Sequence, residues 1–328
     1  MERATTYASF DIPVTGVTML GCSHGFDKTG RTTGFVLWVN RRGLMVDPPP
    51  NSSRILVNMG IPPSSIEAVF LTHCHADHDA GTFQKILQGS MIKIYTTRTI
   101  IDSFLRKYAA LSGFSTEFIG RLFEFCPLRV GEVTRLAGGI EIECFYSLHV
   151  IPCIGLLARC HDKTIVYSGD THTSPELFDT MRADGVIGDA RCAALKKFPW
   201  HADLILHEMG VPPIHTPPDV LRALPTHVKT RLLVVHASKS AIPADSGLER
   251  APEWGTIRFK VIRSVTSQRN EIFTLLRPLP WLAALGDDQL MRLIDESNAL
   301  IRKIKRGKKL VKAGDSCGKF HVVAVSEN

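Results

Sequence analysis

The amino-acid sequence predicts an α/β protein with mixed sheets, and three observations lead to this prediction. Short apolar runs of strand length recur along the chain, each ended by a turn. In two regions, residues 66–97 and 163–236, these runs alternate with helical patterns, as they do in parallel βα units. The 328 residues, 44% of them apolar, can bury the core of one large domain or two ordinary ones.

The first half of the chain is predicted to consist of strands, short helices and one long helical region. Apolar runs predict strands over residues 16–23, 66–73 and 91–97. The run TGFVLWVNRRGLMVD predicts a hairpin that turns at NRRG and ends at Asp47. Short helices are expected at 52–60 and 81–89. From Arg98 to Phe125 apolar side chains recur at helical spacing, which predicts a helical insertion.

The second half returns to strands and then alternates between strands and helices. Strands are predicted for IEIECFYS, CIGLLARC, KTIVYSGD, ADLILHE and RLLVVHAS, with a helix at PPDVLRALP. Two prolines in RPLPW, residues 277–281, mark a boundary, and Asp287 or Asp288 is expected to cap the helix that follows. We therefore expect two domains, residues 1–277 and 278–328.

Charge and composition narrow the classes of function. The formal charge is +7, but residues 302–312 (RKIKRGKKLVK) account for all of it, so the remainder is neutral and offers no broad nucleic-acid surface. No apolar stretch approaches the roughly eighteen residues of a membrane span, and the N-terminus lacks the apolar core of a signal peptide. The eight cysteines form no CxxC pair, which is typical of reduced thiols. These features predict a cytoplasmic protein with no membrane partner.

The stretch AVFLTHCHADHDAG carries the strongest functional signal. Directly after a predicted strand it places four side chains that can bind metals: His73, His75, Asp77 and His78. Such a group would be costly to desolvate without a metal, and its nitrogen and oxygen donors suit zinc or a similar first-row ion. Along an extended chain Cys74 points away from the histidines on either side, so we expect it to pack. Asp77 and His78 are expected in a turn that Gly81 allows to change direction.

One loop cannot complete the coordination of two metals, so further ligands are expected at the ends of other strands. His149, Asp170 and His236 each follow a predicted strand, after IECFYSL, TIVYSG and RLLVV. A histidine at the end of a single strand is ordinary, but these three residues together with the loop form a consistent set of ligands.

This pattern resembles the metallo-β-lactamase superfamily, in which an HxHxDH loop at the end of a core strand binds two metals within an αββα sandwich. The resemblance covers about residues 16–275. The residues that it implies for the first metal are His73, His75 and His149, and for the second Asp77, His78 and His236. It further implies that Asp170 bridges the two metals and that Asp47 is the family's supporting aspartate.

Several segments are similar to the ribonuclease Z branch of this superfamily, whose members process transfer-RNA 3′ ends or cleave other phosphodiesters. These segments are MLGCS, RTTGFVLWVNRRGLMVD, RILVNMGIPPSSIEAVFLTHCHADHDAG, ADLILHE, HT and LLVVHAS. The similarity implies that Glu208 and His215 form a pair beside the metals that assists departure of the leaving oxygen. Members that cut transfer RNA often carry a basic arm between the residues equivalent to His149 and Asp170, where this chain has only twenty residues. A small phosphodiester or nucleotide is therefore favoured over RNA.

The segment from Leu279 to the end resembles the beginning of a cyclic-nucleotide-binding domain. A predicted helix, a basic strand and a glycine turn precede the sequence AGDSCGKFHVV. In such a domain, the part that binds the cyclic phosphate comes later. The fold expected for the chain is thus an α/β, αββα metallo-β-lactamase sandwich with a small C-terminal extension.

The residues and the resemblance together predict a dinuclear metal-dependent hydrolase, a phosphodiesterase that attacks with a hydroxide bridging two metals. Asp77 would orient or deprotonate the nucleophile, and His215, polarised by Glu208, would protonate the leaving oxygen. Zinc is the expected metal, with manganese and iron as alternatives. Transfer-RNA processing, thioester or lactone hydrolysis, and a non-catalytic cyclic-nucleotide sensor stay open. A homodimer also stays open, because the insertions 98–132 and 181–200 could shape either the pocket or a dimer contact.

Overall fold

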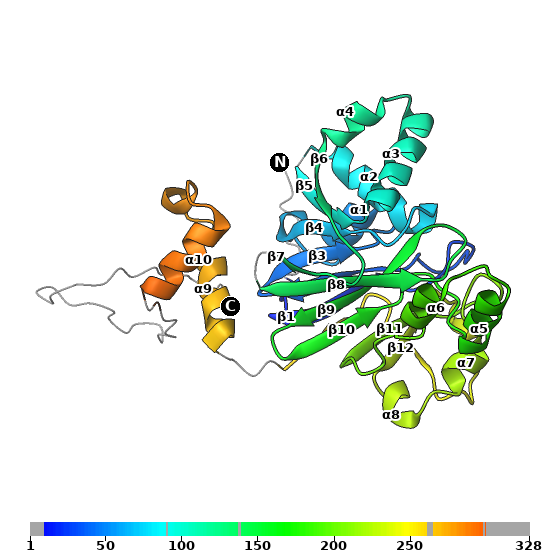
Figure 1. Cartoon of the computed structure of the whole chain (residues 1–328). Helices are drawn as coiled ribbons and strands as arrows, with labels where there is room; N and C mark the ends of the chain where they lie inside the picture. The colour runs from blue at the N-terminus through cyan, green and yellow to red at the C-terminus, as the bar shows by residue number, and fades with distance from the viewer. Residues whose placement is uncertain (1–9, 90, 137–138, 261–264, 298, 300–328) are drawn as a thin grey trace, which may run out of the picture. The chain divides into compact units, whose positions relative to one another are not determined.

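The computed structural model describes residues 10–89, 91–136, 139–260, 265–297 and 299. The chain divides into two units, which we describe separately. The first unit holds the described residues up to Leu136 and from Ile140 to 260, and the second contains the helices that follow (Figure 1). In the described part of the chain, no helix is both long enough and apolar enough to cross a membrane.

The first unit is built on two seven-stranded mixed sheets that pack face to face (Figure 1). The first sheet, in spatial order, consists of β14 (Thr256–Arg258), β1 (Thr15–Gly21), β2 (Gly34–Val39), β3 (Arg42–Val46), β4 (Ile66–Phe70), β5 (Ile92–Thr96) and β6 (Phe123–Pro127). The second consists of β13 (Glu249–Arg250), β12 (Leu232–Val235), β11 (Leu204–Glu208), β10 (Lys163–Tyr167), β9 (Cys153–Cys160), β8 (Ile140–Ser147) and β7 (Val133–Leu136).

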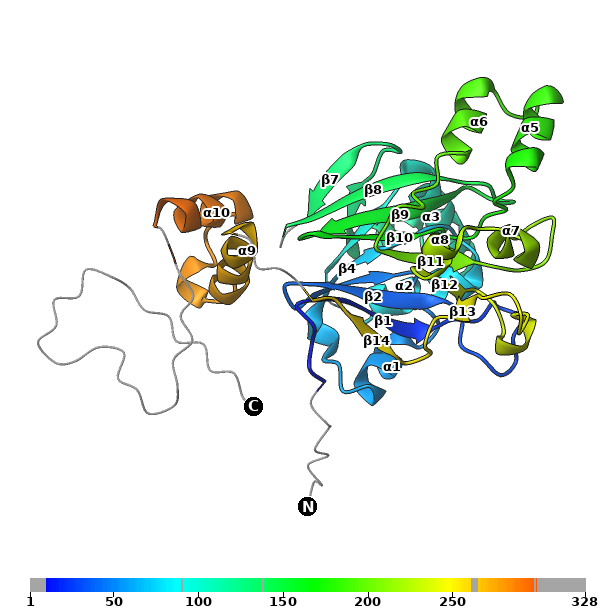
Figure 2. The same cartoon turned by 90° about the horizontal axis from the view of Figure 1, so that it is seen from below.

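Helices cover the outer side of each sheet, which gives the αββα layers (Figure 1). Beside the first sheet lie α1 (Ser52–Asn58), α2 (Ala76–Leu87), α3 (Arg98–Ser112) and α4 (Thr116–Gly120), with the short 3₁₀ helix η1 (Pro63–Ser65) before β4. On the side of the second sheet lie α5 (Pro175–Ala183), α6 (Asp189–Leu195), α7 (Pro218–Arg222) and α8 (Thr226–Lys229). The 3₁₀ helix η2 (Lys239–Ala241) follows β12. α5 and α6 lie side by side at one end of the sandwich (Figure 2).

The core lies between the two sheets and explains the apolar runs of the sequence. β1 and β2 are buried along their whole length, whereas β8 buries alternate residues at its start, as expected for a strand nearer the edge of a sheet. Large side chains from both sheets fill this space, including Phe35, Phe70 and Tyr167. The ring of Phe35 meets that of Tyr167 edge to face, with centroids 5.2 Å apart.

The predicted NRRG hairpin is confirmed. Asn40 and Arg41 connect β2 to β3 with φ angles of 51° and 65°, the left-handed conformation that two-residue hairpin turns require. β3 then ends directly before Asp47, as predicted.

The helix after the histidine loop begins earlier than predicted. α2 starts at Ala76, so Asp77 and His78 lie in its first turn and not in a turn before it. Carboxylates in a first turn are favoured by the helix dipole, which helps to explain this start. Gly81 is helical, and its role is close packing: a Cβ there would lie 2.3 Å from the carbonyl oxygen of Pro49. The expectation that Gly81 redirects a turn was wrong.

Two further elements differ from the sequence prediction. The region from Arg98 to Phe125 is not wholly helical, because β6 begins at Phe123 and pairs in parallel with β5. The helix α10 (Asp287–Glu296) is preceded by Gly286 as its cap, and the side chain of Gln289 accepts the Gly286 N–H at 2.8 Å. The predicted aspartate caps therefore lie inside the helix.

The second unit contains α9 (Val265–Leu276), the 3₁₀ helix η3 (Pro280–Leu282) and α10. One hydrophobic cluster joins these elements, formed by Ile272, Phe273, Leu282, Leu290 and Ile294. The predicted resemblance of residues 278–328 to a cyclic-nucleotide-binding domain falls mainly on residues outside the described ranges, so it stays a prediction.

Candidate metal centre

The strand directions bring the predicted site residues to one edge of the sandwich. β3 to β6 run parallel, as do β10 to β12, and β8 runs in the same direction as β10 because both are antiparallel to β9. Residues that follow strands of one direction meet at the same edge of a sheet. These residues are Asp47 after β3, His73 after β4, His149 after β8, Asp170 after β10 and His236 after β12.

The first group of donor atoms is formed by His73, His75, His149 and Asp170. His75 Nδ1 lies 3.2 Å from His73 Nε2 and 3.1 Å from His149 Nε2. Asp170 Oδ2 lies 3.6 Å from His73 Nε2 and 3.9 Å from His149 Nε2. One donor atom from each residue falls within 4.8 Å of all the others, so these four side chains can surround one cation.

A second group adjoins the first and is formed by Asp77, His78 and His236. Asp77 Oδ2 lies 3.6 Å from His78 Nε2 and 3.4 Å from His236 Nε2. Asp170 reaches this group too, with Oδ1 3.3 Å from His78 Nε2 and Oδ2 3.4 Å from His236 Nε2. The seven residues predicted as ligands therefore lie together, with Asp170 between the two groups.

Asp47 determines which ring nitrogen of two histidines faces the cluster. Its Oδ2 accepts the hydroxyl of Thr72 at 2.6 Å and lies 3.0 Å from Nδ1 of His78. Because the Thr72 hydroxyl donates to Asp47, it must accept a proton from Nδ1 of His73, 2.9 Å away. Both histidines thus carry a proton on Nδ1 and turn Nε2 toward the other donors. Asp47 supports the ligands from behind, since its oxygens also accept the Thr72 N–H and the Tyr167 hydroxyl.

This arrangement is suited to a cation. His78 Nε2 and Asp170 Oδ1 are buried and form no hydrogen bond in the described structure, so both atoms lack a partner. Burial alone would lower the pKa of His78, yet the carboxylates of Asp170, Asp47 and Asp77 outweigh it and raise that pKa well above its usual value. The surplus of negative charge attracts positive charge, and imidazole with carboxylate donors suits a transition metal. The donor set therefore fits metal binding.

Glu208 and His215 lie at the rim of this cluster, as predicted. Glu208 ends β11 and is fully buried, with its Oε1 accepting the N–H of Thr216 at 2.7 Å. Its Oε2 lies 3.1 Å from Nδ1 of His215. The His215 ring lies over two predicted ligands, with centroids 4.8 Å from His236 and 5.7 Å from His149.

The pair is arranged to keep a proton on the imidazole. Burial alone would lower the pKa of His215, but its interaction with the Glu208 carboxylate outweighs burial and raises this pKa above its usual value. Burial also raises the pKa of Glu208, while His215 acts in the opposite direction. Oε1 of Glu208 accepts the Thr216 N–H and Oε2 faces Nδ1 of His215 at 3.1 Å, an arrangement that favours a carboxylate beside a protonated imidazole.

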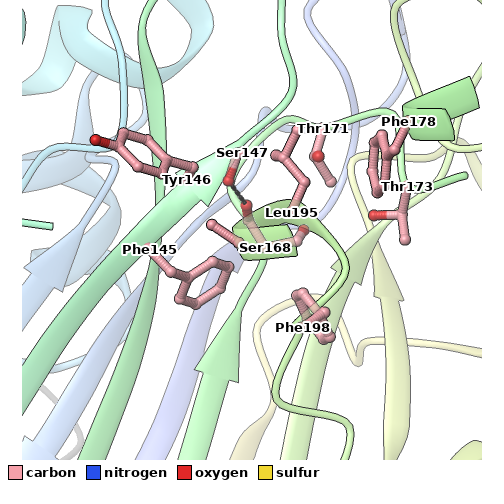
Figure 3. A pocket seen from close by; sticks show the side chains of 10 residues that line it. Phe145, Tyr146, Ser147, Ser168, Thr171, Thr173, Phe178, Leu195 and Phe198 are labelled. Atoms are coloured by element: carbon pink, nitrogen blue, oxygen red, sulfur yellow. Dashed lines mark hydrogen bonds between the residues drawn. The ribbon is translucent and has the colours of Figure 1, made fainter. Parts of the chain in front are cut away.

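A network of hydroxyl groups holds the loop that carries Asp170, and Figure 3 shows the part of it formed by Ser147 and Ser168. The Ser147 hydroxyl donates to the Ser168 carbonyl at 2.6 Å, and the Ser168 hydroxyl accepts the Glu208 N–H at 3.0 Å. Thr216 donates its hydroxyl to the Thr171 carbonyl at 2.8 Å. The cavity that these groups help to line has a volume of about 10 Å³, roughly the space of one water molecule. It is too small for a substrate, so its hydroxyls serve to position the site.

Helix α3 fixes the histidine loop through contacts that the sequence analysis did not identify. The Lys107 ammonium donates to the Cys74 carbonyl at 2.9 Å and to both oxygens of the buried Asp79 at 2.7 Å. The Tyr108 hydroxyl donates to Asp79 at 2.7 Å. The Cys74 thiol points away from the cluster and donates to the Ile100 carbonyl at 3.3 Å, as the alternation of side chains predicts.

Replacing Lys107 with methionine is expected to destabilise the protein by about 2 to 4 kcal/mol, because it leaves the Asp79 carboxylate buried without its cation. The double variant Lys107→Met/Asp79→Asn removes that charge and should recover part of the loss. Urea unfolding of the wild type, of Lys107→Met, of Asp79→Asn and of the double variant at pH 7 measures both effects. If the double variant is as unstable as the sum of the two single variants, Asp79 does not depend on Lys107.

Comparison with solved structures confirms the fold. Human tRNase Z, short form, aligns over 75% of this chain and 100% of its own, with a TM-score of 0.51 and 17% identity. At that level of identity the likeness concerns the fold, and it establishes the metallo-β-lactamase sandwich predicted from the histidine loop.

Two similar proteins come from Dictyostelium discoideum. The "cGMP-dependent 3′,5′-cGMP phosphodiesterase A" is 43% identical over 96% of this chain and 36% of its own length. The "cAMP/cGMP-dependent 3′,5′-cAMP/cGMP phosphodiesterase B" is 36% identical over 96% of this chain and 29% of its own length. The chain thus spans about a third of the length of these relatives.

The sequence also matches a described protein family over residues 15–251, which comprise both sheets apart from β14 and all seven predicted ligands. Well over half of the chain lies within this match. The chain therefore belongs to the family described as anti-Pycsar protein Apyc1, on a metallo-β-lactamase fold.

Proposed function

We propose that this chain is a dinuclear metal-dependent phosphodiesterase that hydrolyses 3′,5′-cyclic nucleotides. The observation that carries the proposal is the position of the Glu208–His215 pair directly beside two donor groups that share Asp170. The names of the two Dictyostelium relatives, which match along nearly the whole of this chain, support cyclic nucleotides as the substrate class.

The proposed ligands are His73, His75 and His149 for one ion and Asp77, His78 and His236 for the other, with Asp170 shared. Zinc is the expected metal, and manganese or iron would suit the same donors. When bound, two such ions lower the pKa of a water molecule and neutralise phosphate oxygens.

Asp77 is the proposed residue for handling the nucleophile. Its side chain is partly open to solvent, unlike those of His78 and Asp170. Burial alone would raise the pKa of Asp77, but His236 and His78 outweigh it and lower this pKa, so the carboxylate stays ionised. An ionised carboxylate at the open side of the cluster can orient an attacking water and accept its proton.

His215 is the proposed acid for the leaving oxygen. Its Nδ1 faces Glu208, so Nε2 is the nitrogen that remains for a substrate. The hydrolysis of a cyclic phosphodiester releases an alkoxide, a poor leaving group that needs a proton. Since Glu208 keeps the imidazole protonated, the pair can supply that proton at neutral pH.

The structure favours a small nucleotide over transfer RNA. Between His149 and Asp170 the chain forms only the hairpin of β9 and β10, joined at His161 and Asp162, so no protruding arm lies there. We therefore propose a single nucleotide as the substrate.

Hydrolysis of cGMP, cAMP and bis(p-nitrophenyl) phosphate by metal-reconstituted protein tests this function, with Asp77→Ala as the control. We expect the wild type to hydrolyse these substrates, a chelator to abolish this activity, and Asp77→Ala to lack it. A protein that holds two metals but turns over none of these substrates would contradict the proposal and favour a thioesterase, a lactonase or a non-catalytic sensor.

A further inference from the structure

An open groove lies beside the candidate metal centre, with a volume of about 660 Å³. The loop after β1 and the loop after β12 form its two walls. The residues that line it are His24, Phe26, Asp27, Lys28, Thr29, Ser238, Lys239 and Ser240.

The groove lies next to the metal centre. The ring of His24 lies 6.2 Å from that of His236, one of the proposed ligands. The neighbouring Gly25 packs against Asp77 so closely that a Cβ there would lie 2.9 Å from Asp77 Oδ2. A molecule whose phosphate is held at the centre can therefore extend past His24 into the groove.

The first wall of the groove is held in place by its own hydrogen bonds. Oδ1 of Asp27 accepts the N–H of Thr29 at 2.9 Å, the hydroxyl of Thr29 at 2.8 Å and the N–H of Gly30 at 3.1 Å. The N–H of Phe26 donates to Nδ1 of His24 at 3.2 Å. Such a loop loses little conformational entropy when it binds a ligand.

The loop after β1 exposes the aromatic ring of Phe26 to solvent. The side chain of Phe26 is 93% exposed, although burial of a phenylalanine is strongly favourable. Lys28 and Lys239 stand on the two walls of the same groove, and both are exposed. An exposed ring with cations nearby suits a ligand that has a flat aromatic part and a negative charge.

We propose that this groove is the nucleoside subsite of the enzyme, where Phe26 stacks on the base of the nucleotide, while the charges of Lys28 and Lys239 attract the anionic substrate from solution. The inference rests on the proposed phosphodiesterase function. Stacking on an aromatic side chain tolerates different bases, so this subsite would accept more than one cyclic nucleotide.

The test compares substrates with and without a base. Steady-state kinetics of wild type and Phe26→Ala are measured with cGMP, with cAMP and with an abasic 3′,5′-cyclic deoxyribose phosphate. The preference of kcat/KM for cGMP over the abasic compound is expected to fall roughly tenfold or more in Phe26→Ala, mainly through KM. Phe26→Trp should restore it. Phe118→Ala, which removes a 47% exposed ring on α4, is the matched control and should keep the preference.

A second arm tests the lysines. The double variant Lys28→Met/Lys239→Met is expected to raise KM for cGMP and to weaken its dependence on salt concentration, while kcat stays within about twofold. Lys197→Met, at an exposed lysine that follows α6, is the control.

The outcomes separate this inference from the function on which it rests. Wild-type turnover of cGMP together with an unchanged base preference in Phe26→Ala would overturn the subsite and leave the function intact. A wild type that turns over none of the three compounds would overturn both.

Discussion

Replacement of Asp170 with alanine is expected to remove at least one metal ion from each chain and to lower turnover about a thousandfold or more. Asp170 is buried, and its carboxylate lies within 3.9 Å of donor atoms in both groups of ligands. The loss of one ion removes several kcal/mol of transition-state stabilisation, which corresponds to about three orders of magnitude in rate.

Elemental analysis and cGMP hydrolysis of the same preparation measure the two effects of Asp170→Ala. Asp189→Ala serves as the matched control, because this aspartate of α6 is 94% exposed and should keep both ions and full turnover. Retention of two ions by Asp170→Ala would refute the bridging assignment.

The second large effect is expected from His215→Ala, and it should depend on the leaving group. Positioned acids contribute roughly a hundredfold to ten-thousandfold to rates when the leaving group is poor. We therefore expect cGMP hydrolysis to fall at least a hundredfold, while bis(p-nitrophenyl) phosphate, whose leaving group needs no proton, slows only a few times. Metal content should be unchanged. Equal slowing of both substrates would remove His215 from the role of acid.

The pH profile gives an independent check on the same pair. Glu208 raises the pKa of His215, so the imidazole holds its proton below that raised pKa and loses it as pH rises through it. Turnover of cGMP by the wild type should accordingly decline on the alkaline side. Glu208→Gln removes the negative charge and should move this decline to lower pH. His201→Ala, at an exposed histidine after α6, should leave the profile unchanged.

Much of the metal centre could be predicted because its residues follow strands that are visible as apolar runs. His149, Asp170 and His236 each end such a run, and the directions of the strands bring them to the histidine loop. The contacts that support these residues could not be predicted from the sequence. Tyr167 donates to Asp47 across 120 positions of the chain, and no local pattern indicates which tyrosine will meet which aspartate.

The differences between the predicted and the observed fold have similar causes. Gly81 looked like a turn residue because glycine favours turns, but the helix places it against the prolines that follow Asp47, where only a hydrogen fits. β6 was hidden at the end of a helical pattern, since five residues are too few to establish a strand by alternation. The sequence gives no indication of the role of Lys107, which only its contact with the buried Asp79 shows.

Zinc titration of metal-free protein, with cGMP turnover followed at each step, tests the central claim most directly. Two bound ions per chain, with turnover that rises only as the second equivalent is added, is the result that the shared Asp170 predicts. Full turnover in the metal-free protein, or none when two ions are bound, would contradict a dinuclear phosphodiesterase.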